Sequence, residues 1–212
     1  MDMSKRDFDA EAGTWDENPG RVKLAGDIVS AISREIALHG GMDVLDFGCG
    51  TGLITLGLVP LVRSVTGVDS SQGMLDVLRQ KMSTRNIQTV NTLHMDIENG
   101  DVLKGSFDLV VSSMTLHHVR DTFPLLQKLF QVTMPGGHLC IADLDLDEGK
   151  FHENGEGIFH NGFDRSQLRR ALMEAGFEEV RDRTASGVVK FVVGEGVTVF
   201  TIFLMTGRKK QT

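Results

Sequence analysis

One short segment constrains the fold of this chain more than any other. The strand-like run 44–47, apolar except for Asp46, passes directly into three glycines at alternate positions, Gly48, Gly50 and Gly52. Glycine lets the backbone turn sharply and approach a ligand closely, and a helix that follows offers unpaired amide groups in its first turn. Open α/β sheets bind ligands at the carboxyl ends of their strands. The segment therefore predicts a strand, a ligand-binding turn and a helix.

Short apolar runs and amphipathic stretches alternate along most of the chain, which predicts a mostly parallel sheet covered on both faces. Asn18-Pro19 predicts the start of an N-terminal helix that ends at Gly40-Gly41. Near the C-terminus two strand-like runs follow a helix with no long helix between them, which predicts an antiparallel hairpin at one edge. The predicted strands are 43–47, 64–68, 89–94, 107–112, 138–142, 177–184 and 197–206, and the helices include 74–82, 123–132 and 164–175.

Composition narrows the choice of partners. The formal net charge is −7, and the only basic cluster is Arg208–Lys210, so we expect no nucleic-acid partner. The N-terminus has no apolar signal core, and the apolar region 188–205 is interrupted by charges and glycines, so we expect no membrane partner. Cys49 and Cys140 fit buried free thiols in a reducing compartment. We therefore expect a cytoplasmic protein.

Acidic residues end two further predicted strands. Asp69 comes 17 residues after Gly52, where a carboxylate accepts hydrogen bonds from ribose hydroxyls; the alternative is a cap for the next helix. Asp96 can accept from the exocyclic amine of adenine while Ile97 packs on the ring; the alternative is a capping or solvated aspartate.

These segments together resemble the class I S-adenosylmethionine-dependent methyltransferases. Asp46–Gly52 resembles the first motif of that family, Val68-Asp69 its ribose-binding acid, and Asp96-Ile97 its adenine-binding pair. Phe107–Val111 and Met134–Leu139 resemble its fourth strand and the turn into its fifth. The resemblance implies a Rossmann-like three-layer α/β sandwich, in which the last strand of a seven-stranded, mostly parallel sheet is antiparallel. It also implies S-adenosylmethionine as cofactor.

The resemblance also assigns residues to the cofactor. Met114–His118 is similar to the ubiquinone/menaquinone-type, small-molecule branch of the family. By that analogy the glycine turn holds the methionine end of the cofactor, Asp46 reaches its amino group, and Ser113 lies beside its methionine part. Ser70, next to Asp69, belongs to the same site. Met74 packs near the adenosine or, alternatively, is a core residue of its helix.

For the residues on the acceptor side, more than one role stays open. His117 and His118 follow the fourth strand, and either can act as a general base, a polar wall or a structural hydrogen-bonding residue. Trp15 lines the acceptor pocket or anchors the N-terminus. The polar, non-periodic loop 145–163, with His160, is expected to form part of the acceptor pocket or a lid. No spacing matches a metal site, so none is assigned.

We therefore expect a single domain, 1–212, with an N-terminal helical cap (1–40), a cofactor-binding core (41–145), and an acceptor-side loop, helix and closing hairpin (146–212). The expected activity is in-line transfer of a methyl group to a small acceptor. Two alternatives stay open. A nicotinamide-dependent oxidoreductase would need a variant of the G-x-G-x-x-G turn. A non-catalytic S-adenosylmethionine-binding protein fits because fold and cofactor site do not establish chemistry.

Overall fold

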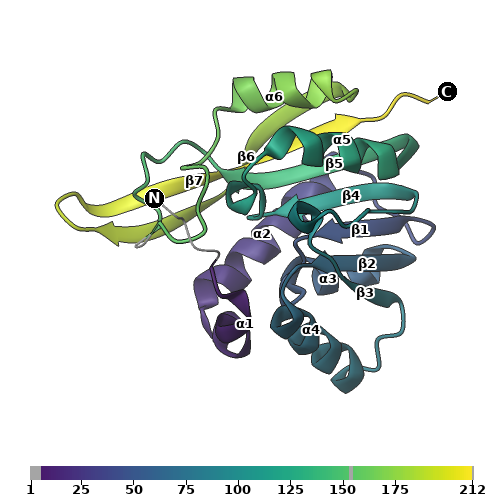
Figure 1. Ribbon diagram of the computed structural model, residues 1–212, viewed down its shortest axis with the longest axis horizontal. Helices are drawn as coiled ribbons and strands as arrows, with labels where there is room; N and C mark the ends of the chain where they lie inside the picture. Colours follow the sequence, from purple (N-terminus) through teal and green to yellow (C-terminus); the bar gives the residue numbers. More distant parts are fainter. Residues whose placement is uncertain (1–5, 153–154, 212) are drawn as a thin grey trace.

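The computed structural model describes residues 6–152 and 155–211. Its centre is one seven-stranded sheet in the order β3-β2-β1-β4-β5-β7-β6 (Figure 1). All strands run parallel except β7, which is antiparallel to both of its neighbours. The predicted fold class is thus confirmed. The strands are β1 Asp43–Phe47, β2 Ser64–Asp69, β3 Val90–His94, β4 Phe107–Ser113, β5 Thr133–Leu144, β6 Glu178–Val192 and β7 Gly196–Arg208.

Helices cover both faces of the sheet (Figure 1). α2, α3 and α4 pack on one face, and α5 and α6 on the other. Successive residues of a strand enter opposite cores, so Val44 joins the first and Leu45 the second. This explains why the inner strands read as continuous apolar runs. The helices are α1 Phe8–Glu11, α2 Pro19–Glu35, α3 Leu53–Leu58, α4 Gln72–Thr84, α5 Thr122–Val132 and α6 Arg165–Glu174, and the 3-10 turns are η1 Ala12–Glu17, η2 Val59–Leu61, η3 Ile97–Asn99 and η4 Leu116–His118.

Several element boundaries differ from the sequence prediction: β6, for example, runs on to Val192 where the prediction ends at 184. Two further cases show the physical cause. α2 begins as predicted, with the Asn18 side chain accepting from the Gly20 amide at 2.9 Å, but it ends at Glu35. It ends there because Ile36 turns extended (φ −116°, ψ 127°) to bury its side chain in the core. β5 begins before the predicted 138–142 segment, since the Gly136 amide still donates to the Lys209 carbonyl.

The carboxyl ends of the central strands meet at one edge of the sheet. The register pairs Phe47 of β1 with Val68 of β2 and with Ser112 of β4, and Ser113 with Ala142 of β5. The glycine turn, Asp69 and the segment after β4 therefore emerge side by side. Across the stretches 6–152 and 155–211, no helix is both long and apolar enough to cross a bilayer.

Candidate active site

The glycine turn after β1 holds three left-handed residues, with φ +75° at Gly48, +54° at Gly50 and +83° at Gly52. A Cβ at Gly48 would lie 2.2 Å from Thr115 Oγ1, and one at Gly52 would lie 2.3 Å from Leu78 Cδ1. Close packing therefore requires glycine at these two positions. At Gly50 the nearest atom to such a Cβ is 4.0 Å away, so this position leaves open space above the turn.

Asp69 ties the end of β2 to this turn. One carboxylate oxygen accepts from the Gly50 amide at 2.7 Å, and the other accepts from the Ser71 amide at 2.9 Å. The cap of α4 is Ser71, whose hydroxyl accepts from the Met74 amide at 3.1 Å. The capping alternative for Asp69 is thus not what the structure shows. Each carboxylate oxygen has a second lone pair, so Asp69 can also accept from a diol.

Asp46 carries a buried carboxylate with one oxygen unpaired. One oxygen accepts from Thr55 Oγ1 at 2.5 Å, whereas Oδ1 has no hydrogen-bond partner among the residues that the structure describes. Burial raises the pKa of Asp46 to about 6; the Thr55 hydrogen bond opposes this rise and the charge of Asp69 adds to it. Buried polar atoms normally have partners. An ammonium group, directly or through water, would satisfy Oδ1 and favour the ionised carboxylate.

The expected adenosine side lies next to Asp69. The Met95 amide donates to the Asp69 carbonyl at 2.9 Å, and His94 Nε2 donates to the Ser70 carbonyl at 3.0 Å. These bonds place Asp96 beside the end of β2. The Asp96 carboxylate accepts from Asn99 at 3.0 Å. Ile97, Met74 and Ser113 complete the predicted set; Ile97 and Ser113 are half-buried, and Met74 is buried beside Gly50.

Two aspartates of the N-terminal segment, which the sequence did not assign to the site, bond to the glycine turn and to the start of α4. Asp16 Oδ1 accepts from Thr51 Oγ1 at 2.6 Å, and the same carboxylate pairs with Lys81, whose Nζ donates to the Thr51 carbonyl at 2.7 Å. Asp9 accepts from the Ser71 hydroxyl at 2.6 Å. These partners are far apart in sequence, and no local motif marks an exposed-looking aspartate as part of a distant turn.

A second group of polar side chains gathers at the ends of β4 and β5. His117 Nδ1 donates to Asp143 Oδ1 at 2.6 Å, and both residues are buried. Burial opposes ionisation of Asp143, but the charge and hydrogen bond of His117 hold the pKa of that carboxyl below its ordinary value. Within the described stretches 6–152 and 155–211, Asp143 Oδ2 has no hydrogen-bond partner. Asp143 was missed, although an acid ending an apolar run is the signal that pointed to Asp69.

Two more imidazoles lie against His117. The ring of His118 is 4.2 Å away between centroids, and that of His152 is 5.0 Å away. Burial lowers the pKa of His118 to about 3 and that of His152 to about 4, and His117 adds to both shifts. Both rings are therefore neutral near pH 7. His118 Nδ1 donates to the Gly157 carbonyl at 2.8 Å, which fixes its tautomer.

The other two acceptor-side candidates, Trp15 and His160, differ in how they contact the imidazole cluster. Phe8 packs against His118 at 5.0 Å, and Trp15 packs behind Phe8 at 5.9 Å. His160 Nε2 donates to the Val119 carbonyl at 2.9 Å, so this residue holds the loop on η4 rather than joining the imidazole cluster. The histidine of this loop that does belong to the imidazole cluster is His152. Among residues 6–152 and 155–211, no three His, Cys, Asp or Glu side chains are arranged to hold a metal ion.

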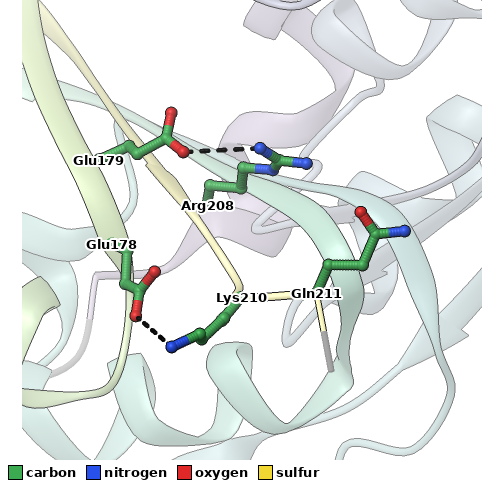
Figure 2. A pocket seen from close by; sticks show the side chains of 5 residues that line it. All are labelled: Glu178, Glu179, Arg208, Lys210 and Gln211. Atoms are coloured by element: carbon green, nitrogen blue, oxygen red, sulfur yellow. Dashed lines mark hydrogen bonds and ion pairs between the residues drawn. The ribbon is translucent and has the colours of Figure 1, made fainter.

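A shallow hollow of about 230 Å³ lies away from these groups, where β6 begins and β7 ends (Figure 2). Its charges pair with one another: Glu179 with Arg208 at 3.5 Å and Glu178 with Lys210 at 4.0 Å. In the sheet, Arg208 is also the register partner of His138, near the start of the β5 segment. The hollow therefore opens at the edge opposite the glycine turn.

Comparison with known proteins agrees with this geometry. A family model described as a methyltransferase domain matches residues 44–137. The chain is 36% identical over 136 residues to an uncharacterised methyltransferase of Schizosaccharomyces pombe, covering 58% of this chain and 48% of that protein. It is 34% identical over 187 residues to the demethylmenaquinone methyltransferase of Staphylococcus aureus, covering 74% and 77%. The chain thus spans only about half the length of some curated relatives it matches.

The fold comparison points the same way. A solved structure of Haemonchus contortus phosphoethanolamine N-methyltransferase 2 with S-adenosyl-L-methionine superposes with a TM-score of 0.69. Its sequence identity is 18%, and the match covers 86% of this chain and 52% of that one. The glycine turn, the acids at the strand ends and these likenesses define the class: the chain belongs to the class I S-adenosylmethionine-dependent methyltransferases. The cofactor of that class is S-adenosylmethionine.

Proposed function

We propose that this protein transfers a methyl group from S-adenosylmethionine to a small acceptor by in-line displacement. The observation that carries the proposal is the hydrogen bond from the Gly50 amide to Asp69, which joins the glycine turn and the ribose-type acid, with the unpaired oxygen of Asp46 close by in sequence. The likeness to the S. aureus demethylmenaquinone methyltransferase supports a small-molecule acceptor.

Different residues of the chain would bind different parts of the cofactor. The glycine turn would hold the methionine end and Asp46 its ammonium group, while Asp69 would accept from the ribose hydroxyls. Asp96 and Ile97 would take the adenine, with Met74 beneath the turn. The bound cofactor supplies an activated sulfonium. The protein's part is alignment, which lowers barriers by ~7–11 kcal/mol in well-oriented reactions.

On the acceptor side we assign the general base to His117. Its Nδ1 proton is donated to Asp143, so in the neutral ring Nε2 keeps a lone pair. A proton taken up at Nε2 would give an imidazolium next to a buried carboxylate, a pair without net charge. His118 has its Nδ1 proton engaged by a backbone carbonyl, and we assign it to the pocket wall.

A general base at His117 suits an acceptor that loses a proton as it is methylated. The rings of Phe8 and Phe151 pack against His118 at 5.0 Å and against His152 at 4.9 Å, so apolar side chains surround the imidazoles. We therefore propose a weakly acidic hydroxyl on an apolar frame, such as a phenol.

In this reaction His117 Nε2 would accept the hydroxyl proton of the acceptor and later return it to solvent. Bound S-adenosylmethionine would supply the methyl group that the oxygen takes up, with S-adenosylhomocysteine as the second product. The aromatic side chains around the cluster would exclude water while positive charge disperses from the sulfonium.

Two measurements test the proposal in sequence. Calorimetry with S-adenosylhomocysteine should show saturable binding to one site, while NADH should give no heat. Labelled methyl transfer from S-adenosylmethionine should then favour simple phenols over primary amines and thiols. NADH binding without S-adenosylhomocysteine binding would establish the oxidoreductase alternative. Cofactor binding without transfer across the whole acceptor panel would favour a non-catalytic protein.

A further inference from the structure

The β6–β7 hairpin extends well beyond the helices that cover the rest of the sheet (Figure 1). One face of its outer half is apolar and exposed, and we call it the hairpin face. Opposite residues on this face pair directly across the two strands, Val189 with Val199 and Phe191 with Val197. The exposed fractions are 64% for Val189, 75% for Phe191, 91% for Val193, 74% for Val197 and 61% for Val199.

The opposite face of the same hairpin is packed in the usual way. Val188 and Val192 lie against the core that contains α2, and Phe200 is buried in it. Antiparallel sheets with one solvated face normally alternate apolar and polar residues. Here the exposed face of the outer half is apolar instead, while the packed face mixes apolar residues with Lys190 and Thr198. An exposed apolar face is the pattern of a strand surface that another element covers.

The change in character occurs where helical cover ends. Closer to the body of the protein, the same side of the hairpin carries Asp182 and Thr184, which bond to arginines of α6: Asp182 pairs with Arg169, and Thr184 accepts from Arg165 at 2.9 Å. α6 begins at Arg165. Beyond it, no element within residues 6–152 and 155–211 packs on the hairpin face, as the exposures show.

We infer that the hairpin face is an interface between two copies of this chain. Four valines and one phenylalanine at these exposures offer on the order of 500–600 Å² of apolar surface. Pairing the face with its own copy would remove roughly 1,000–1,200 Å² from water, which reaches the size of a specific interface. A two-fold axis lets Phe191 of each copy pack among the valines of the other.

The charges around the face favour this occupant over a membrane. The charges at the tip are neutralised locally, because Glu195 pairs with Lys150 at 2.8 Å. Lys190 points away from the hairpin face and donates to the Phe151 carbonyl at 2.7 Å. In the part of the chain that the structure describes, no basic rim therefore surrounds the apolar residues, and the chain carries a formal charge of −7. Anionic lipid surfaces attract the opposite kind of surface.

Dimerisation would also brace the acceptor side. Phe151 packs against Phe200 of the hairpin at 5.4 Å and against His152 at 4.9 Å. A hairpin held by a second copy would therefore hold the loop that carries His152. The dimer itself stands independently of the proposed methyl transfer, because it concerns a different surface.

Sedimentation velocity on the full chain, from about 1 to about 100 μM, tests the proposal. The variant Val189→Thr/Phe191→Thr/Val197→Thr makes the face polar with a β-branched residue of good strand propensity. Val102→Thr is the matched control, since Val102 is 65% exposed in a loop elsewhere. The single variant Phe191→Thr serves if the triple variant lowers the melting temperature.

We expect the wild type and Val102→Thr to sediment as dimers, and the hairpin variants to dissociate with a constant raised at least about tenfold. A wild type that stays monomeric to about 100 μM would overturn the proposal, as would a dimer that persists unchanged in the triple variant. Co-flotation of a monomeric wild type with phosphatidylcholine vesicles, lost in the triple variant, would assign the face to lipid instead.

Discussion

His117 and Asp143, 26 residues apart in the chain, meet through a hydrogen bond of 2.6 Å between Nδ1 and Oδ1. Neither side chain has more than 2% of its surface exposed. The carboxylate fixes both the orientation of the ring and the position of its proton, because an ionised carboxylate only accepts. The other ring nitrogen is thereby left as an acceptor, on the segment that follows β4 at the site edge.

Replacing either member of this pair should reduce turnover of a phenolic acceptor. His117→Gln removes the base and should lower kcat by ~10²–10⁴. Asp143→Asn should act nearly as strongly, because an amide N–H would donate to Nδ1 and move the ring proton to Nε2. S-adenosylhomocysteine binding, measured by calorimetry, should change by less than about twofold, since neither residue touches the proposed cofactor site.

A neighbouring histidine gives the matched control for this pair. His118→Gln, in the same turn, should lose far less kcat than His117→Gln, because the Nδ1 proton of His118 is already engaged by the Gly157 carbonyl at 2.8 Å. A His117→Gln enzyme with wild-type kcat for the phenolic acceptor would rule out the assignment of the base.

Asp69, at the end of β2, should contribute more to cofactor binding than the solvent-exposed Asp76 on α4. Asp69→Ala should weaken S-adenosylhomocysteine binding by ~2 kcal/mol or more, about 30-fold, because two buried acceptors are lost and the Gly50 amide is untied. Asp76→Asn on exposed α4 is the control and should leave the dissociation constant unchanged. Equal affinities for the wild type and Asp69→Ala would remove this residue from the site.

Gly48 and Gly50 should respond differently to alanine. Gly48→Ala forces a Cβ to within 2.2 Å of Thr115 in a left-handed residue, so we expect a loss of several kcal/mol of stability. Gly50→Ala meets only Met74 Sδ at 4.0 Å and should cost ~1 kcal/mol, while still obstructing the cofactor. Urea denaturation and calorimetry report the two effects separately. Similar stability losses in both variants would contradict the packing argument.

Asp46 should make stability depend on pH between about 4 and 6. Its folded-state pKa is raised from 3.8 to about 6, mainly by burial. The folded state therefore holds the proton more tightly than the unfolded state, so the free energy of unfolding falls as pH rises through this window, by about 3 kcal/mol in all. Asp46→Asn should abolish this part of the slope.

Denaturation of the wild type and Asp46→Asn at pH 4 and pH 7 checks this. The variant should be more stable than the wild type at pH 7, yet bind S-adenosylhomocysteine more weakly, since an amide cannot ion-pair with an ammonium group. An unchanged difference between the two proteins at both pH values would show that the buried carboxyl is not a source of strain.

Much of the fold could be predicted from sequence because its signals are local. The strand that becomes β1, the cap at Asn18 and the acids that end β2 and β3 are each set by a few neighbouring residues, and a parallel sheet brings strand ends together whatever the details. The ends of the elements were predicted less accurately. The helix α2 ends before Ile36 because the side chain of Ile36 is buried in the core, and helix propensity does not report such a tertiary contact.

The sequence by itself thus determined a Rossmann-like sheet with a glycine turn and an acid at the next strand end. The tertiary structure alone decided that Asp143 holds His117, that Asp16 covers Thr51, and that the outer half of the β6–β7 hairpin stands uncovered. The physical reason is the separation along the chain over which each interaction acts. Backbone conformation and periodicity are fixed by nearby residues, whereas a hydrogen bond or a burial between segments 26 or 35 residues apart exists only once the sheet has brought them together.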